Sequence, residues 1–236
     1  MKNDISKNVE RLRKNSYSGR GIVMGLNKSG DSAVQVYWVM GRSENSRNRI
    51  LVEQDNVVRT VPFDESKVED PSLIIYNALV QVGDSHIVSN GDQIDTIANG
   101  LSKQQTMEES LKSRTYESDE PNYTPRISGV VKLRETPEFT FGIIRREDSP
   151  EPIRQYFTFS KEIEKGMGHC IHTYKEDGNP LPSFDSEPYI VPLGESANEI
   201  AKFYWNLLNK ENRVGIVAKI VDLKTKKVDF TILNQL

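Results

Sequence analysis

Two polar segments of the chain hold most of the side chains that could carry out chemistry. The first, residues 41–49 (GRSENSRNR), contains Arg42, Arg47 and Arg49 with a single acid, Glu44. A guanidinium offers five N–H donors in a planar fork, so three of them near the end of a strand can clamp a phosphate or a carboxylate. The alternative for this segment taken alone is a solvated turn whose arginines face water.

The second segment, residues 116–126 (YESDEPNYTPR), combines three carboxylates, two phenols and an arginine. Its two prolines stiffen the backbone and disfavour both helix and strand. The segment runs into a strand, so Arg126 is expected at a strand entrance, where loops commonly carry binding and catalytic residues. A solvated acidic loop is the alternative here.

The elements that must position these segments are mostly strands. Residues 33–40 (AVQVYWVM) are apolar on both faces, which predicts a strand covered on two sides. Residues 175–194, with four prolines and two glycines, are expected to form a long loop. Alternation and turn residues predict the other strands at 22–27, 49–54, 56–61, 73–82, 86–89, 126–134, 139–146, 153–159, 167–174, 213–223 and 227–233.

Helical patterns are fewer. The clearest helix is expected at 197–209, where Ser196 and Glu199 form a capping box, and Asn90 and Gln93 are expected to form a capping pair for another helix. The other predicted helices are 4–14, 94–101 and 104–112. Strands, then helices, then strands again indicate an α+β protein with segregated elements. We therefore expect one domain, residues 1–236, made of two sheets with helices packed outside them.

Charge and hydropathy restrict the class of protein. The net charge at pH 7 is −3, whereas affinity for a phosphate backbone needs clustered excess cations, so the charge argues against a general nucleic-acid binder. No stretch approaches the roughly 20 apolar residues of a membrane span, and the first residues lack the apolar core of a secretory signal. Cys170 is the only cysteine, so no intrachain disulfide is expected and the predicted location is cytoplasmic.

Several motifs resemble the archaeal-type IMP cyclohydrolase family. The most specific is YESDEPNYTPRISGV from Tyr116 onward, and the weaker ones are YSGRG at 17–21, GRSENSRNR at 41–49, VSNGDQIDTI at 88–97 and GHCIHTY at 168–174. The resemblance implies a four-layer αββα sandwich like that of the N-terminal-nucleophile hydrolases. It also implies closure of a purine nucleotide precursor, 5-formamidoimidazole-4-carboxamide ribonucleotide, to IMP with release of water. No metal or other cofactor is implied.

Such a ring closure needs a base near the attacking nitrogen, cationic donors for the developing oxyanion and an acid for the departing oxygen. Under the resemblance, Glu117 is the expected proton acceptor and Asp119 is its rival. The expected oxyanion contacts are Arg42 and Arg126, and the phenol is expected from Tyr37 or Tyr116. The 5′-phosphate is assigned to Arg47 and Arg49, with Arg20 as a third candidate. The remaining candidates for substrate contact are Asn122, Thr124, His172 and Tyr174.

Other reactive side chains predict no second site. His169 and Cys170 are neighbours on a strand, so they point to opposite faces and cannot form a nucleophile–base pair. His172 lies about 6.6 Å from Cys170 along that strand, beyond hydrogen-bond reach. The spacing of the three histidines does not match a zinc site, so no metal is predicted.

Two alternatives to a cyclohydrolase stay open. One is an amide hydrolase acting on a related purine nucleotide, and the other is a non-catalytic binder of such a nucleotide. Lys2 follows Met1, so loss of Met1 exposes no Ser, Thr or Cys, which disfavours a terminal-nucleophile amidase. The acids of residues 117–120 disfavour a pure phosphate binder. A homo-oligomer is compatible with the sequence.

Overall fold

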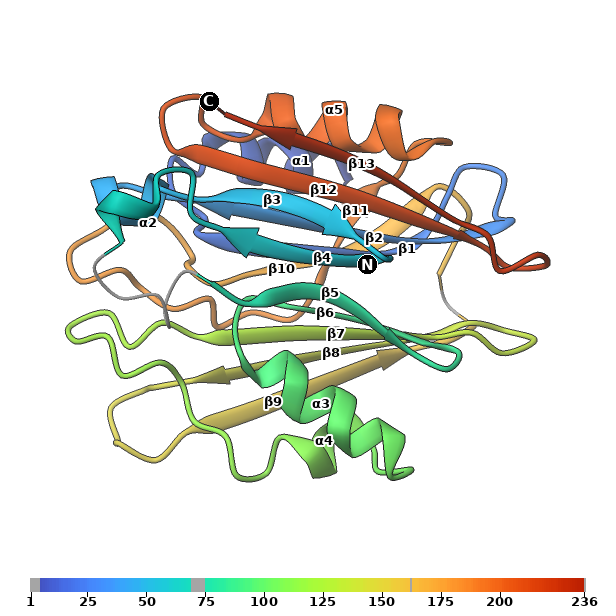
Figure 1. Cartoon of the computed structure of the whole chain (residues 1–236), viewed down its shortest axis with the longest axis horizontal. Coiled ribbons are helices and arrows are strands. Elements are labelled where there is room, and N and C mark those ends of the chain that lie inside the picture. The colour runs from blue at the N-terminus through green and yellow to red at the C-terminus, as the bar shows by residue number, and fades with distance from the viewer. Residues whose placement is uncertain (1–4, 69–74, 162, 236) are drawn as a thin grey trace.

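The computed structural model describes residues 5–68, 75–161 and 163–235 (Figure 1). Within these ranges the first sheet contains, in spatial order, β11 (Tyr189–Pro192), β10 (Met167–His172), β1 (Arg20–Leu26), β2 (Ser32–Met40), β12 (Arg213–Asp222) and β13 (Val228–Asn234). The second contains β3 (Ile50–Gln54), β4 (Val57–Val61), β5 (Asn77–Val82), β6 (Ser85–Ser89), β7 (Arg126–Lys132), β8 (Glu138–Arg145) and β9 (Ile153–Phe159). The helices are α1 (Ile5–Lys14), α2 (Glu44–Arg47), α3 (Gln93–Ser102), α4 (Met107–Ser110) and α5 (Ala197–Leu207), with a 3-10 turn, η1 (Glu65–Lys67).

The two sheets stack face to face. Their strands pair antiparallel, with β1 and β2 in the middle of the first sheet and β5, β6 and β7 in the middle of the second. Helices α1 and α5 lie over the outer face of the first sheet, and α3 and α4 lie over the outer face of the second (Figure 1). The predicted α+β class with two antiparallel sheets is confirmed. No helix in the described ranges has the length and apolar character needed to cross a membrane.

Strand β2 is buried along its whole length, as its sequence predicts. On one face Trp38 stacks on Tyr204 of α5, with ring centroids 6.2 Å apart. On the other face, between the sheets, the Tyr37 hydroxyl lies 2.7 Å from that of Tyr76. Each face of the strand therefore faces a different layer, which is why neither carries exposed polar residues.

The edge strand β3 of the second sheet lies beside β12 and β13 of the first. The Leu51 backbone N–H donates to Asn234 Oδ1 at 2.9 Å, and Asn234 Nδ2 donates back to the Leu51 carbonyl at 2.9 Å. The chain between β2 and β3 consequently crosses from one sheet to the other within a few residues. The predicted arginine turn occupies this crossing and folds as the one-turn helix α2.

Helix starts depart from the sequence prediction in detail. Ser196 does accept the Glu199 N–H at 3.2 Å, but the Glu199 carboxylate accepts from Glu195 instead of returning to Ser196. Asn90 and Gln93 do bond to each other, yet the N-cap of α3 is Asp92, so the predicted capping pair is wrong. The predicted helix at 104–112 is only the single turn α4.

Two predicted elements need a boundary correction. The predicted loop at 175–194 contains the short strand β11, which extends the first sheet beyond β10. Of the predicted strand at 73–82, residues 73 and 74 lie outside the described ranges, and β5 begins at Asn77. Residue 4 of the first predicted helix also lies outside them.

Lys219 on β12 is fully buried between the sheets. Its cross-strand neighbour Gln35 donates to the backbone carbonyl of His86 on the opposite sheet at 3.0 Å, which places this face in the interior. Among the described residues Lys219 Nζ has no hydrogen-bond partner, and it stands 5.5 Å from the centroid of the Phe230 ring. Burial lowers the pKa of Lys219 to about 8.

Replacing Lys219 by Met is expected to stabilise the fold at pH 7. At that pH the lysine is protonated in both the folded and the unfolded state, so the whole cost of burying the charge, about 3 kcal/mol, opposes folding. Above pH 8 the folded state releases the proton while the unfolded chain keeps it, so the unsubstituted protein gains stability as pH rises to about 10. Urea unfolding at pH 7 and 9.5 should show the advantage of the Met variant shrinking. A Met variant less stable than the parent at pH 7 contradicts the prediction.

Candidate active site

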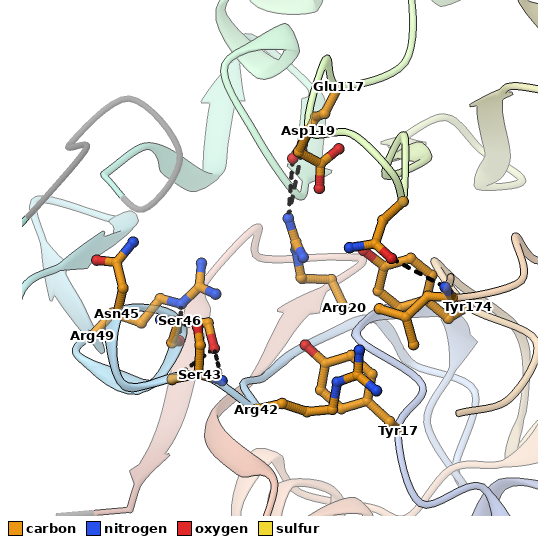
Figure 2. Close-up of a pocket in the computed structure, with 12 residues that line it drawn as sticks. Tyr17, Arg20, Arg42, Ser43, Asn45, Ser46, Arg49, Glu117, Asp119 and Tyr174 are labelled. Atoms are coloured by element: carbon orange, nitrogen blue, oxygen red, sulfur yellow. Dashed lines mark hydrogen bonds and ion pairs between the residues drawn. The ribbon is translucent and has the colours of Figure 1, made fainter. Parts of the chain in front are cut away.

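A buried ion pair joins the first strand of the fold to the acidic segment. Arg20 begins β1, and its backbone N–H donates to Thr173 Oγ1 at 3.1 Å. Its Nη2 lies 3.3 Å from Glu117 Oε2, and both side chains are more than nine-tenths buried. The Glu117 N–H donates to the Thr124 carbonyl at 2.9 Å, which folds the acidic segment back on itself above the sheet end. Figure 2 shows Arg20 extending toward this carboxylate.

The ion pair has shifted protonation equilibria. Burial raises the pKa of Glu117 and outweighs the opposing effects of Arg20, Arg126 and Arg49. The arginines alone would lower this pKa, but withdrawal of the carboxylate from water costs more than the guanidiniums return. For Arg20, burial lowers the pKa, but Glu117 and the neighbouring tyrosines together raise it well above its ordinary value. Arg20 is thus permanently charged, while Glu117 accepts a proton more readily than an exposed glutamate.

The ion pair borders a pocket of about 350 Å³ that is lined on its other side by α2 (Figure 2). Ser43 and Ser46 form a capping box at the N-terminus of α2, in which each side chain accepts from the backbone N–H of the other residue. Arg49, which follows α2, is only 3 % exposed, and its Nε donates to the Ser46 carbonyl at 2.8 Å. Its Nη1 has no hydrogen-bond partner within the described ranges. A buried guanidinium that keeps a free N–H donor beside a pocket is suited to bind an anion there.

The three arginines of the first polar segment lie in different positions relative to this pocket. Arg49 faces the pocket as described. Arg42 also lines it, with its guanidinium 4.8 Å from the centroid of the Tyr17 ring and hydrogen-bonded to Asp177 at 2.5 Å. Arg47 lies exposed in the last turn of α2 and does not line the pocket, so the expected grouping of Arg47 with Arg49 is corrected.

The third wall of the pocket is a hydrogen-bonded chain. Asp119 accepts from the Thr124 N–H at 2.7 Å and from the Thr124 hydroxyl at 2.5 Å. The Thr124 oxygen also lies 2.5 Å from the Tyr174 hydroxyl, and burial raises the pKa of Tyr174 to about 12. Asn122 lines the same wall and accepts from the Leu181 N–H at 3.0 Å. The predicted residues Asp119, Asn122 and Tyr174 therefore meet in one pocket, with Thr124 as the link between two of them.

A second, smaller pocket of about 190 Å³ shares Glu117 with the first. Arg126 lines it and donates from Nη1 to Asp92 Oδ1 at 2.6 Å and to Gln93 Oε1 at 2.7 Å. Tyr76 lines the second pocket too, and Tyr37 reaches the site only through the hydroxyl of Tyr76. Glu117 thus stands between a pocket lined by Arg20, Arg42 and Arg49 and another lined by Arg126.

Two further predicted site residues lie elsewhere. The Tyr116 hydroxyl donates to the Pro150 carbonyl at 2.8 Å, and Tyr116 lines neither pocket. His172 is buried against Phe184, its Nδ1 is 2.8 Å from the Tyr174 carbonyl, and burial lowers its pKa to about 3. Neither Tyr116 nor His172 lines either pocket, contrary to the expectation that both contribute to the site.

Sequence reasoning missed Tyr76 and Gly91, which line the second pocket. Tyr76 falls within a run predicted as a strand, where an aromatic residue is ordinary core material, so no local signal marks it. Gly91 lies in the VSNGDQIDTI motif, and the position of this motif before a helix was the one sequence signal that could have marked Gly91 as a site residue. In the described ranges no group of three or more His, Cys, Asp or Glu side chains is arranged to hold a metal ion.

Comparison with known proteins agrees with the geometry. The family described as IMP cyclohydrolase-like protein matches residues 17–226. An IMP cyclohydrolase of Methanocaldococcus jannaschii is 28 % identical over 208 residues, 87 % of this chain and 94 % of that protein. Another from Methanococcus maripaludis strain C7 is 35 % identical over 191 residues, 79 % and 86 % of the two chains. One from Haloquadratum walsbyi is 33 % identical over 119 residues, 49 % of this chain and about half, 56 %, of its own length. This chain therefore belongs to the IMP cyclohydrolase-like protein family.

Proposed function

We propose that this protein is an IMP cyclohydrolase, which closes 5-formamidoimidazole-4-carboxamide ribonucleotide to IMP. The observation that carries the proposal is the position of Glu117, a buried carboxyl group shared by two pockets, each of which is also lined by at least one arginine. A phosphate needs the cations, and an amide that must lose a proton needs the carboxylate. Two relatives aligned over most of their length carry the name of this activity, which supports the assignment.

The substrate would lie with its 5′-phosphate beside α2. Arg49 supports this position, since it lines the pocket and its Nη1 has no hydrogen-bond partner among the described residues, and Arg42 supplies a second guanidinium at the pocket. A pocket of about 350 Å³ is within the ordinary size range of small-molecule sites. The imidazole and its two amide groups then extend toward Glu117 and Arg126.

In the reaction the carboxamide nitrogen attacks the formyl carbon, a C–N bond forms, and the formyl oxygen takes up negative charge. Glu117 accepts a proton from the carboxamide nitrogen. Arg126 donates to the oxyanion, and Arg20 compensates the charge of Glu117 throughout. Glu117 returns the carboxamide proton to the oxyanion, and the phenol of Tyr76, coupled to that of Tyr37, is our candidate for donating the second proton. The C–O bond then breaks, water leaves, and a C=N bond forms to the formamide nitrogen, whose proton restores the phenol. Asp119 positions the acidic segment.

Other features belong to the same proposal. We include a four-layer arrangement related to that of the N-terminal-nucleophile hydrolases, a single domain over residues 1–236 and a cytoplasmic location. The stacked sheets with outer helices support the first of these. A core that joins side chains of both sheets supports the second.

The direct test is to incubate the purified protein with the formylated ribonucleotide and to identify the product by chromatography and absorbance. IMP formation at a rate proportional to enzyme concentration supports the proposal. Release of formate with the free amine identifies an amide hydrolase instead. Nucleotide binding by calorimetry without any product identifies a non-catalytic binder.

A further inference from the structure

Asn90 and Gln93 form a buried polar chain that ends on Arg126. Both side chains are 0 % exposed. Asn90 Oδ1 accepts from the Ile127 backbone N–H at 2.8 Å and from Gln93 Nε2 at 2.8 Å. Asn90 Nδ2 donates to the Pro125 carbonyl at 2.9 Å, and Gln93 Oε1 accepts from Arg126 Nη1 at 2.7 Å. The chain thus ties the loop after β6, the start of α3 and the first residues of β7 to one guanidinium.

The donor and acceptor of every hydrogen bond in this polar chain are determined by the groups at its two ends. A backbone N–H can only donate and a backbone carbonyl can only accept, so Ile127 and Pro125 leave the Asn90 amide one orientation. Asn90 Oδ1 then requires a donor from Gln93, which turns Gln93 Oε1 toward Arg126. A guanidinium has donors only, so the far end of the chain agrees with the near end. Rotating either amide by 180° would place two donors or two acceptors together in a buried site.

Gly91 lies where this chain meets Glu117. A Cβ on Gly91 would stand 2.8 Å from Gln93 Oε1, 3.0 Å from Arg126 Nη1 and 3.6 Å from Glu117 Oε1. Its φ lies outside the left-handed region, so the backbone does not demand glycine here. The missing side chain keeps open the space between the guanidinium and the carboxylate.

We propose that Asn90 and Gln93 are positioning residues that hold Arg126 at the reacting amide groups, and that Gly91 keeps clear the space those groups occupy. This inference rests on the proposed function for its activity readout. Asp92 holds the same Nη1 but is largely solvent-exposed, with 56 % of its side chain accessible, so it is the weaker constraint. The buried amide chain fixes the guanidinium, and a displacement of about 1 Å in such a group can reduce turnover about 10²-fold.

The test compares Gln93→Met with Gln35→Met. Both glutamines are buried, but Gln35 lies between the sheets and donates to His86 rather than to the site. Gln93→Met is expected to lower kcat by about 10²-fold with a smaller change in KM, since Arg126 acts on the transition state. Gln35→Met is expected to change the melting temperature and leave kcat within about threefold. Gly91→Ala is expected to lower kcat/KM without a fall in melting temperature.

Normal kcat in a folded Gln93→Met variant overturns the proposal. If that variant does not fold, Gln93→Asn keeps the amide but is one carbon too short to bridge Asn90 and Arg126, and must show the same loss of kcat. If the unsubstituted protein makes no IMP, the proposed function has failed. The hydrogen-bonded chain from Asn90 through Gln93 to Arg126 is then tested separately by ¹⁵N-arginine NMR. The Arg126 Nη signals, assigned with Arg126→Lys, should be resolved in the parent and averaged by rotation in Gln93→Met. Identical signals in both proteins overturn the proposal independently of activity.

Discussion

Glu117→Gln is expected to lower kcat by about 10²- to 10⁴-fold, the usual contribution of a general base, with little change in KM. The amide has nearly the shape of the carboxylate and can still accept a hydrogen bond from Arg20, which lies 3.3 Å away. It cannot accept a proton from the substrate. Steady-state kinetics with the formylated ribonucleotide measure both constants, and circular dichroism verifies that the variant folds despite the uncompensated Arg20 charge.

The control is Asp119→Asn, the same chemical change two residues along the chain. Asp119 is engaged by the Thr124 N–H and hydroxyl, so we expect a smaller loss of kcat that reflects a displaced segment. A collapse of kcat in Asp119→Asn with near-normal kcat in Glu117→Gln would mean that the roles are exchanged. Near-normal turnover in both variants places the base elsewhere and contradicts the mechanism.

The pH profile gives the Glu117 assignment a second readout. A base must be deprotonated before it can act, so kcat/KM of the parent falls as pH drops through the pKa of Glu117. Burial raises that pKa, so the acidic limb should begin at a higher pH than for an exposed glutamate. The residual activity of Glu117→Gln should lack this limb. An unchanged limb in the variant assigns the titration to another group.

Local sequence patterns predict the strands well, because each residue of a strand faces one side of its sheet and is apolar where that side is buried. Strand β2 is apolar on both faces and is buried on both. The short extent of α4 and the presence of β11 were not predicted, because neither element has enough residues to show a period. Each depends on the neighbouring element that it packs against or pairs with.

The site was predicted less completely, because its geometry depends on contacts that sequence distance hides. Arg20 and Glu117 are 97 positions apart, so their ion pair follows from the sheet order and not from any local motif. Arg47 and Arg49 are two positions apart and have the same chemistry, yet the end of α2 between them exposes one and buries the other. The sign of the Glu117 pKa shift depends on the burial of that side chain, which residue types alone do not reveal.

Arg49→Ala is expected to raise KM by about 10- to 100-fold, the range for losing a hydrogen bond to a charged group, with a smaller effect on kcat. The phosphate takes no part in bond making, so it is held about equally in the ground and transition states. Arg49 is buried, and its Nη1 has no partner in the part of the chain that the structure describes, so removing this charge relieves its desolvation. The melting temperature should therefore not fall with the loss of affinity, which separates weaker binding from unfolding.

Arg47→Ala is the matched control for this prediction. It removes the same charge from the same turn, so any long-range effect of net charge on the anionic substrate is equal in the two variants. Arg47 is exposed and does not line the pocket, and its KM should stay within about twofold of the parent. Calorimetric titration with IMP, and with inorganic phosphate as a competitor, should show the affinity loss in Arg49→Ala alone. Equal KM values in the two variants would mean that Arg49 does not hold the phosphate, and the substrate would then have to be placed with its phosphate at Arg42 or Arg20.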